Sequence, residues 1–148
     1  MRKFMEEALR EAKKAYALGE VPVGAVVVRG GEIISRAHNM VEAYHDPTAH
    51  AEILAIREAA VKLGSWRLND CEIYVTLEPC IMCTGAIGGS RMKTLIYGAN
   101  DSKEKGLEVI RWELKKTNNL GMEIYEGIME EECKKLLKDF FKEQRADK

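Results

Sequence analysis

The chain has 148 residues and a mass of 16.7 kDa, which fits one domain spanning residues 1–148. Hydrophobic residues make up 46% and charged residues 32%, a balance that excludes a disordered chain. The net charge of −1 gives no support to a nucleic-acid partner. No apolar run approaches the ~20 residues needed to span a bilayer, so we expect no membrane association. Acidic residues interrupt the apolar stretches of the N-terminal segment, which excludes a signal peptide and predicts a cytoplasmic protein.

Apolar periodicity and turn residues predict alternating helices and strands. Residues 23–28 are almost continuously apolar, which predicts a buried strand, and two glycines at 30–31 predict a hairpin turn. Asp46 and Pro47 are typical of an N-cap and a first helical position, so a helix is expected from about residue 48. In chain order we expect helix 1–18, strands 23–28 and 32–37, helix 48–63, strand 72–77, a short helix from about 79, strand 94–98, helix 103–116, strand 122–125 and helix 130–145. This order predicts an α/β fold, a three-layer α/β/α sandwich on a five-stranded mixed sheet.

Two short fragments carry a histidine and two cysteines near the expected starts of two helices. They are residues 47–52, which contain His50, and residues 77–83, which contain Cys80 and Cys83. Helix N-termini carry partial positive charge and favour thiolate over thiol. One imidazole and two thiolates provide three ligands for Zn²⁺ and leave the fourth tetrahedral position for water, as in a catalytic site. Zinc lowers the pKa of bound water to around 7, so this site would supply a nucleophile at neutral pH.

Glu52 is the expected proton carrier. If both residues lie on a helix, Glu52 points about 200° away from His50 and does not share its ligand direction. We expect its carboxylate to take a proton from the attacking water and to deliver protons to the ring nitrogen and the departing ammonia. A carboxylate suits this role if burial raises its pKa.

The four cysteines and two aromatic residues also have interpretations that involve no metal or substrate. Cys80 and Cys83 taken alone would also fit a redox pair, but the upstream histidine and glutamate favour zinc. Cys71 and Cys133 stand isolated in apparent strand and helix patterns, which predicts buried core thiols. Two phenylalanines at 140–141 are candidates both for a lid over the base and for the core, and at least one is expected in the core.

The pattern H-x-E followed by P-C-x-x-C is the mark of zinc nucleobase deaminases. The chain resembles the cytidine deaminase superfamily over nearly its whole length. Residues 20–26, 45–52 and 75–80 are similar to bacterial tRNA adenosine deaminases almost word for word, and residues 136–141 resemble the last helix of that family. The resemblance implies the cytidine deaminase α/β/α sandwich and a homodimer.

The same resemblance implies three substrate contacts. Asn39 would hydrogen-bond the base or its sugar. The Ala51 backbone N–H would hold a ring carbonyl or an equivalent acceptor. The Glu78 backbone carbonyl would receive the amino group that leaves.

The expected rim of the site departs from the tRNA enzymes. Residues 100–108 lack the Lys and Gly-Ala-x-Gly-Ser stretch typical of them, and residues 118–120 stand where an Asn-His pair would fall. Residues 88–91 also replace a bulky-His-Ser-Arg motif with Gly-Gly-Ser-Arg. Residues 37–40 and 83–87 instead resemble small fungal-type cytosine deaminases.

These departures and the net charge favour a free base or small nucleoside as the substrate, with conversion of cytosine to uracil as the preferred expectation. A tRNA wobble-adenosine deaminase, which forms inosine, is the alternative, and a guanine deaminase is a further one. In each case a hydrolase acting on the C–N bond of a cyclic amidine replaces the exocyclic amine by a carbonyl and releases ammonia. A non-catalytic zinc-binding module on the same fold is the fourth interpretation, and the presence of Glu52 argues against it.

Overall fold

The computed structural model describes residues 1–101 and 121–146. The predicted helix 103–116, most of the unusual stretch 100–108 and the stretch 118–120 lie outside these residues. The described elements, in chain order, are α1 (Arg2–Ala17), β1 (Gly24–Arg29), β2 (Glu32–His38), α2 (Val41–Tyr44), α3 (Ala51–Leu63), β3 (Cys71–Leu77), α4 (Ile81–Gly89), β4 (Thr94–Ala99), β5 (Glu123–Tyr125) and α6 (Glu130–Ala146). Of the helices in the described part, none is both long and apolar enough to cross a membrane.

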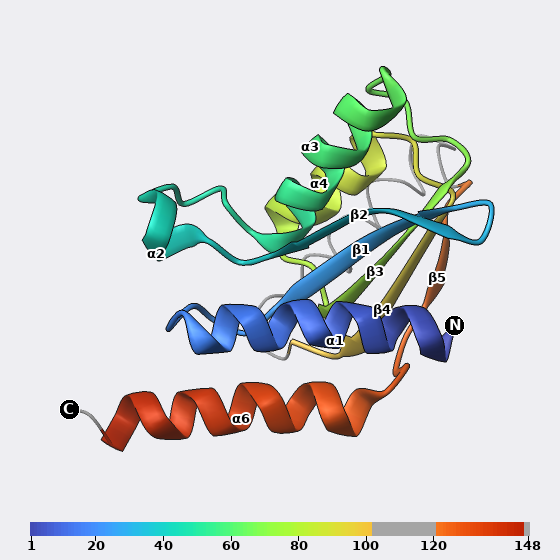
Figure 1. Cartoon of the computed structure of the whole chain (residues 1–148). Helices are drawn as coiled ribbons and strands as arrows, with labels where there is room; N and C mark the ends of the chain where they lie inside the picture. Colours follow the sequence, from blue (N-terminus) through green and yellow to red (C-terminus); the bar gives the residue numbers. More distant parts are fainter. Residues whose placement is uncertain (102–120, 147–148) are drawn as a thin grey trace.

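The strands form one mixed sheet with the order β2-β1-β3-β4-β5. Strand β1 is antiparallel to both of its neighbours, whereas β3, β4 and β5 run parallel to one another. Helices α1 and α6 cover one face of the sheet, and α3 and α4 cover the other (Figure 1). The predicted three-layer α/β/α sandwich with a five-stranded mixed sheet is therefore confirmed.

Strand β1 shows why the sheet is covered on both faces. Successive side chains of a strand point to opposite faces. Ala25 and Val27 pack in the cluster that includes α3, while Val26 and Val28 pack in the cluster that includes α1. All four side chains are buried, so the apolar run at 23–28 corresponds to a central strand with helices on both sides, as predicted.

The start of the third helix differs from the expectation. Helix α3 begins at Ala51 and not near residue 48, and its N-cap is His50 in an extended conformation. The Asp46 carboxylate instead accepts hydrogen bonds from the backbone N–H and the hydroxyl of Thr48, at 2.8 and 2.7 Å. Asp46 therefore stabilises a separate turn before the helix, because its side chain finds donors two residues on before the helix can begin. The short helix α2 was not predicted at all.

The interpretation of the isolated cysteines and of the aromatic pair is confirmed. Cys71 and Cys133 are buried free thiols. Phe140 is buried and meets the Tyr16 ring edge-on, with ring centroids 5.7 Å apart, so it belongs to the core. Phe141, by contrast, is 46% exposed.

We predict that Gly24→Ala destabilises the fold, because helix α1 crosses strand β1 at this glycine. A Cβ at residue 24 would lie 2.0 Å from the Ala8 carbonyl oxygen and 2.5 Å from the Ala12 nitrogen, both backbone atoms that cannot turn away. Overpacking of this kind costs about 1–3 kcal/mol, which chemical denaturation measures as a fall in the free energy of unfolding.

The matched control for this substitution is Gly85→Ala on α4. There a Cβ would point into space that the described residues leave open. The same chemical change should raise the free energy of unfolding by roughly 0.5–1 kcal/mol, since glycine is a poor helix former. Equal destabilisation by both substitutions would contradict the tight helix–strand contact at Gly24.

Candidate active site

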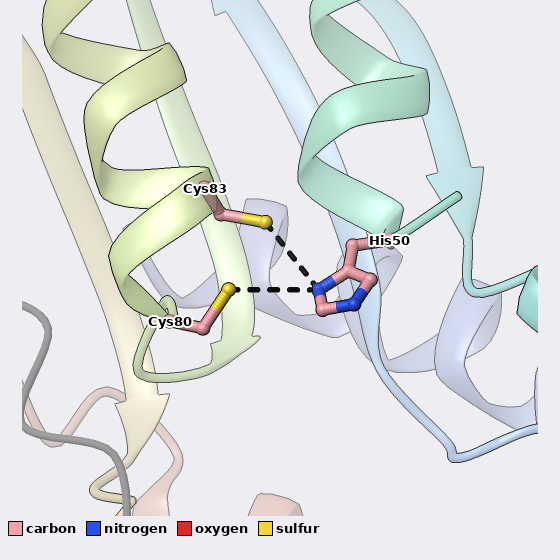
Figure 2. Close-up of side chains that lie close together, drawn as sticks. All are labelled: His50, Cys80 and Cys83. Atoms are coloured by element: carbon pink, nitrogen blue, oxygen red, sulfur yellow. Dashed lines mark hydrogen bonds between the residues drawn. The ribbon is translucent and has the colours of Figure 1, made fainter. Parts of the chain in front are cut away.

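The N-termini of α3 and α4 lie side by side and bring three predicted ligands together. His50 is the N-cap of α3, Cys80 is the N-cap of α4, and Cys83 lies in the first turn of α4. The three side chains point toward one another from the two helices (Figure 2). Within the described part of the chain, they are the one group of three or more histidine, cysteine, aspartate or glutamate residues whose side chains could together hold a metal ion. We call His50, Cys80 and Cys83 the ligand group.

The distances within this group fit a tetrahedral zinc ion. The Nδ1 atom of His50 lies 3.7 Å from the Cys80 Sγ and 3.5 Å from the Cys83 Sγ. Ligands at Zn–N and Zn–S distances of about 2.05 and 2.3 Å, at a tetrahedral angle, are about 3.6 Å apart. The side chains are therefore already spaced for an ion at their centre. One imidazole and two thiols are also the donor types that zinc prefers.

The turn that carries the two cysteines is held by Thr84. Its backbone N–H and its hydroxyl both donate to the Cys80 carbonyl, at 2.9 and 2.8 Å. The hydroxyl also lies 3.3 Å from the Pro79 carbonyl. These bonds place both sulfur atoms at the positive end of α4, where the helix dipole favours thiolate.

The two thiols share a proton unequally. A hydrogen bond from the Cys83 thiol, with a further contribution from His50, lowers the pKa of Cys80 to about 4. The same hydrogen bond, together with burial, raises the pKa of Cys83. A divalent cation can replace this shared proton, because metal ligation requires the thiolate form of cysteine.

Glu52 is buried beside these three residues. Only 4% of the residue is exposed, and burial is the main cause that raises its pKa to about 7. Its carboxyl group interacts with the Cys83 thiol. The expected rotation of 200° does not describe the pair, since His50 is a cap with extended backbone and only Glu52 is helical. Its carboxyl group nevertheless lies next to the predicted ligands without being one of the three.

A hydrogen bond joins Asn39 to Ala51. The Ala51 N–H donates to the Asn39 Oδ1 at 2.8 Å, and the Asn39 N–H donates to the Val23 carbonyl at 3.1 Å. Asn39 is thus tied both to the start of β1 and to the first residue of α3. An acceptor atom of a substrate ring that bound the Ala51 N–H would have to share this donor with the Asn39 Oδ1.

Glu78 lies at the end of β3, just before the cysteine turn. Its N–H donates to the Ala99 carbonyl at 2.8 Å, and its side chain accepts from the Asp101 N–H at 3.1 Å. Glu78 therefore connects the ends of β3 and β4 beside Cys80. The structure brings all seven predicted site residues to this end of the sheet.

A hollow of about 650 Å³ borders the site at Asn39. Its lining includes Glu20, Val41, Phe141 and Arg145, so it extends from the α2 region to the C-terminal helix. No pattern in the sequence indicated a role for Glu20 or Arg145. The one feature of the sequence that could have drawn attention to Glu20 is its place at the start of residues 20–26, the apolar stretch that resembles the tRNA adenosine deaminases.

Comparison with known proteins identifies relatives along almost the whole chain. The family model of MafB19-like deaminases matches residues 1–145. The tRNA-specific adenosine deaminase of Aquifex aeolicus is 49% identical over 96% of this chain and 94% of its own. A solved structure from work on A-to-I editing by tRNA:A34 deaminases has a TM-score of 0.87 at 43% identity and covers 93% of this chain and 100% of its own. The guanine deaminase of Nitrosomonas europaea has a TM-score of 0.82 at 25% identity, covering 94% and 83%.

These relatives correct one expectation from the sequence. Free cytosine or another small substrate was preferred because of the net charge and the altered rim, and this preference is wrong. The relatives 40–49% identical over most of the chain are tRNA-specific adenosine deaminases, the alternative that had been placed second. The resemblance to the cytidine deaminase superfamily and the hydrolytic deaminase chemistry are confirmed. The chain belongs to the MafB19-like deaminase family.

Proposed function

We propose that this protein is a zinc-dependent tRNA deaminase that converts adenosine to inosine at the wobble position. The observation that carries the proposal is the group of His50, Cys80 and Cys83 with buried Glu52 beside it, in a chain whose relatives act on tRNA. We further propose that residues 1–148 form one domain and that the protein works as a homodimer.

His50, Cys80 and Cys83 would hold the zinc ion. Their donor types and the spacing of their ligand atoms support this assignment. When bound there, zinc supplies an activated water at neutral pH. Zinc ligation requires both cysteines as thiolates, so that this chain would contribute two negative charges to the occupied site.

Glu52 carries the protons of the reaction. The oxygen of the attacking water forms a bond to the purine carbon that bears the amine, and Glu52 takes a proton from that water and passes it to the adjacent ring nitrogen. Glu52 then moves the remaining hydroxyl proton to the amine, the C–N bond breaks, and ammonia leaves. The products are the ring carbonyl of inosine and ammonia. Burial suits this role, because it raises the pKa of the Glu52 carboxyl group to about 7, so that the group can both take and give a proton at neutral pH.

Three further residues orient the base in the proposed site. Asn39 presents its amide NH₂ group to the substrate, because its Oδ1 accepts the Ala51 N–H. Ala51 binds a ring acceptor through the same N–H, shared with Asn39. The Glu78 backbone carbonyl receives the leaving amine beside Cys80. The target adenosine has to leave its stack to reach these groups, as in other base deaminases.

The substrate is tested with zinc-loaded protein and a panel of compounds. The panel contains an anticodon stem-loop RNA with adenosine at the wobble position, the same RNA with cytidine there, and free adenosine, cytosine and guanine. We expect inosine in the first RNA and no ammonia from the others, with mass spectrometry and ammonia release as the measurements. Faster turnover of cytosine or guanine than of the RNA would overturn the proposal.

Replacing Cys80 by alanine should remove the metal. The variant loses one of three protein ligands, so zinc content measured by mass spectrometry of the intact protein should fall toward zero, and activity with it. Cys71→Ala is the matched control, because Cys71 is another free cysteine, fully buried, that lies outside the group of His50, Cys80 and Cys83. A Cys80 variant that keeps stoichiometric zinc and full activity contradicts the ligand assignment.

Glu52→Gln should keep zinc and lose turnover. Glutamine has nearly the same shape but cannot carry a proton, so kcat should fall by roughly 10²–10⁴-fold. Zinc content and the melting temperature report whether the site is otherwise intact. Turnover close to that of the unmodified protein would remove Glu52 from its proposed role.

A further inference from the structure

Helix α2 has little packing to hold it in place. It has four residues, Val41–Tyr44, of which Val41 is half-buried and the other three are exposed. Figure 1 shows it at the end of the molecule, away from the helical layers that cover the sheet. A single helical turn is unstable by itself, since nucleation fixes several residues for very few hydrogen bonds. Its position therefore depends on specific polar contacts.

The carboxylate of Glu20 supplies the cap of this helix from 22 residues away. Its Oε1 accepts the Glu42 N–H at 3.0 Å, and its Oε2 accepts the Ala43 N–H at 2.8 Å. These are the second and third helical residues, whose N–H groups an N-cap side chain normally binds. The N-cap itself is Met40, whose thioether is a weak acceptor. Glu20 thus takes over the role that the local sequence leaves open.

The backbone of Glu20 is itself fixed by the end of α1. The Gly19 N–H donates to the Tyr16 carbonyl and the Glu20 N–H donates to the Ala15 carbonyl, both at 3.0 Å. This pair of bonds, with Gly19 at φ 77°, is a Schellman motif. Glu20 is 2% exposed, so its carboxylate is both immobilised and shielded from water. A buried carboxylate that accepts two N–H bonds is a strong anchor.

The anchored segment connects directly to the proposed site. Just before α2, the Asn39 side chain accepts the Ala51 N–H, and the Met40 N–H donates to the Ala49 carbonyl at 3.0 Å. Glu20, Asn39 and Val41 also line the same hollow of about 650 Å³. Moving α2 would therefore change one wall of the hollow, whereas Glu52 and Cys83 are held within the longer helices α3 and α4.

We propose that Glu20 is a positioning residue that holds α2 as the wall of an RNA-binding hollow beside the target base. This inference rests on the proposed function, since it assigns that hollow to the nucleotides next to the wobble adenosine. Glu20 does not touch the reacting atoms. It acts through the backbone of Glu42 and Ala43, and it keeps the fraction of molecules with a formed wall close to one.

Glu20→Gln tests the proposal. The new amide group faces an N–H donor, so one of the two anchoring bonds is lost. Because apparent affinity falls with the fraction of binding-competent molecules, KM for the stem-loop RNA should rise about tenfold. The value of kcat should stay within about twofold, since the wall does not enter the chemical step. In hydrogen exchange, the amides of Glu42 and Ala43 should lose protection.

Ser35→Ala is the matched control. The buried Ser35 hydroxyl on β2 donates to the Ala55 carbonyl of α3 at 2.8 Å, so this variant also loses one buried hydrogen bond. It should leave KM and the exchange at residues 42–43 unchanged. Glu20→Asp, which keeps both acceptors but shortens their reach, should shift KM in the same direction and decides the matter if the glutamine variant does not fold.

An unchanged KM in the Glu20 variants overturns the proposal. So does a fall in kcat with KM unchanged, which would place Glu20 in the chemistry, or unaltered exchange at Glu42 and Ala43. Failure of the proposed function has a different signature, in which the unmodified protein does not deaminate the stem-loop RNA. In that case exchange at residues 42–43 still determines whether Glu20 anchors α2.

Discussion

Two helices that begin side by side on one face of the sheet determine almost everything about the site. The Cys80 sulfur and the His50 imidazole are 30 residues apart in sequence but 3.7 Å apart in space. They meet because α3 and α4 pack on the same face and both start at the end of the sheet where β3 finishes. Each helix also directs the positive end of its dipole toward the ligand group. Glu52, in the first turn of α3, reaches the group for the same reason.

A set of buried polar bonds supports this arrangement at its edge. Asn39 joins the residue just before β1 to the start of α3, and Glu20 joins the end of α1 to α2. The apolar clusters position strands and long helices, but they cannot hold a four-residue helix with an exposed surface. Helix α2 is instead held by the buried carboxylate of Glu20 and the backbone N–H groups of Glu42 and Ala43. Separating these groups costs free energy, because no water replaces the lost hydrogen bonds in a buried place.

The substrate expectation was wrong for an instructive reason. A net charge of −1 is a sum over the whole chain, whereas recognition of one extruded base and its neighbours needs few local contacts. The hollow beside Asn39 already includes Arg145 and the exposed ring of Phe141, a cation and an aromatic surface of the kind that bind nucleotides. Composition therefore could not exclude RNA. The ligand group does not distinguish between these substrates either, because the same residues would serve the deamination of several bases.

The layered fold and the ligand group could be predicted from the sequence, since both depend on local patterns. The apolar run 23–28 indicated a doubly covered strand, and His50 with Cys80 and Cys83 indicated a metal site by donor type and spacing. The start of α3, the existence of α2 and the bond between Asn39 and Ala51 could not be predicted in this way. Asn39 and Ala51 are 12 residues apart, and Glu20 is 22 residues from the N–H group of Glu42 that it caps. Such hydrogen-bond partners are determined by the tertiary structure, because a buried polar group bonds to the donor or acceptor that the packed elements place next to it.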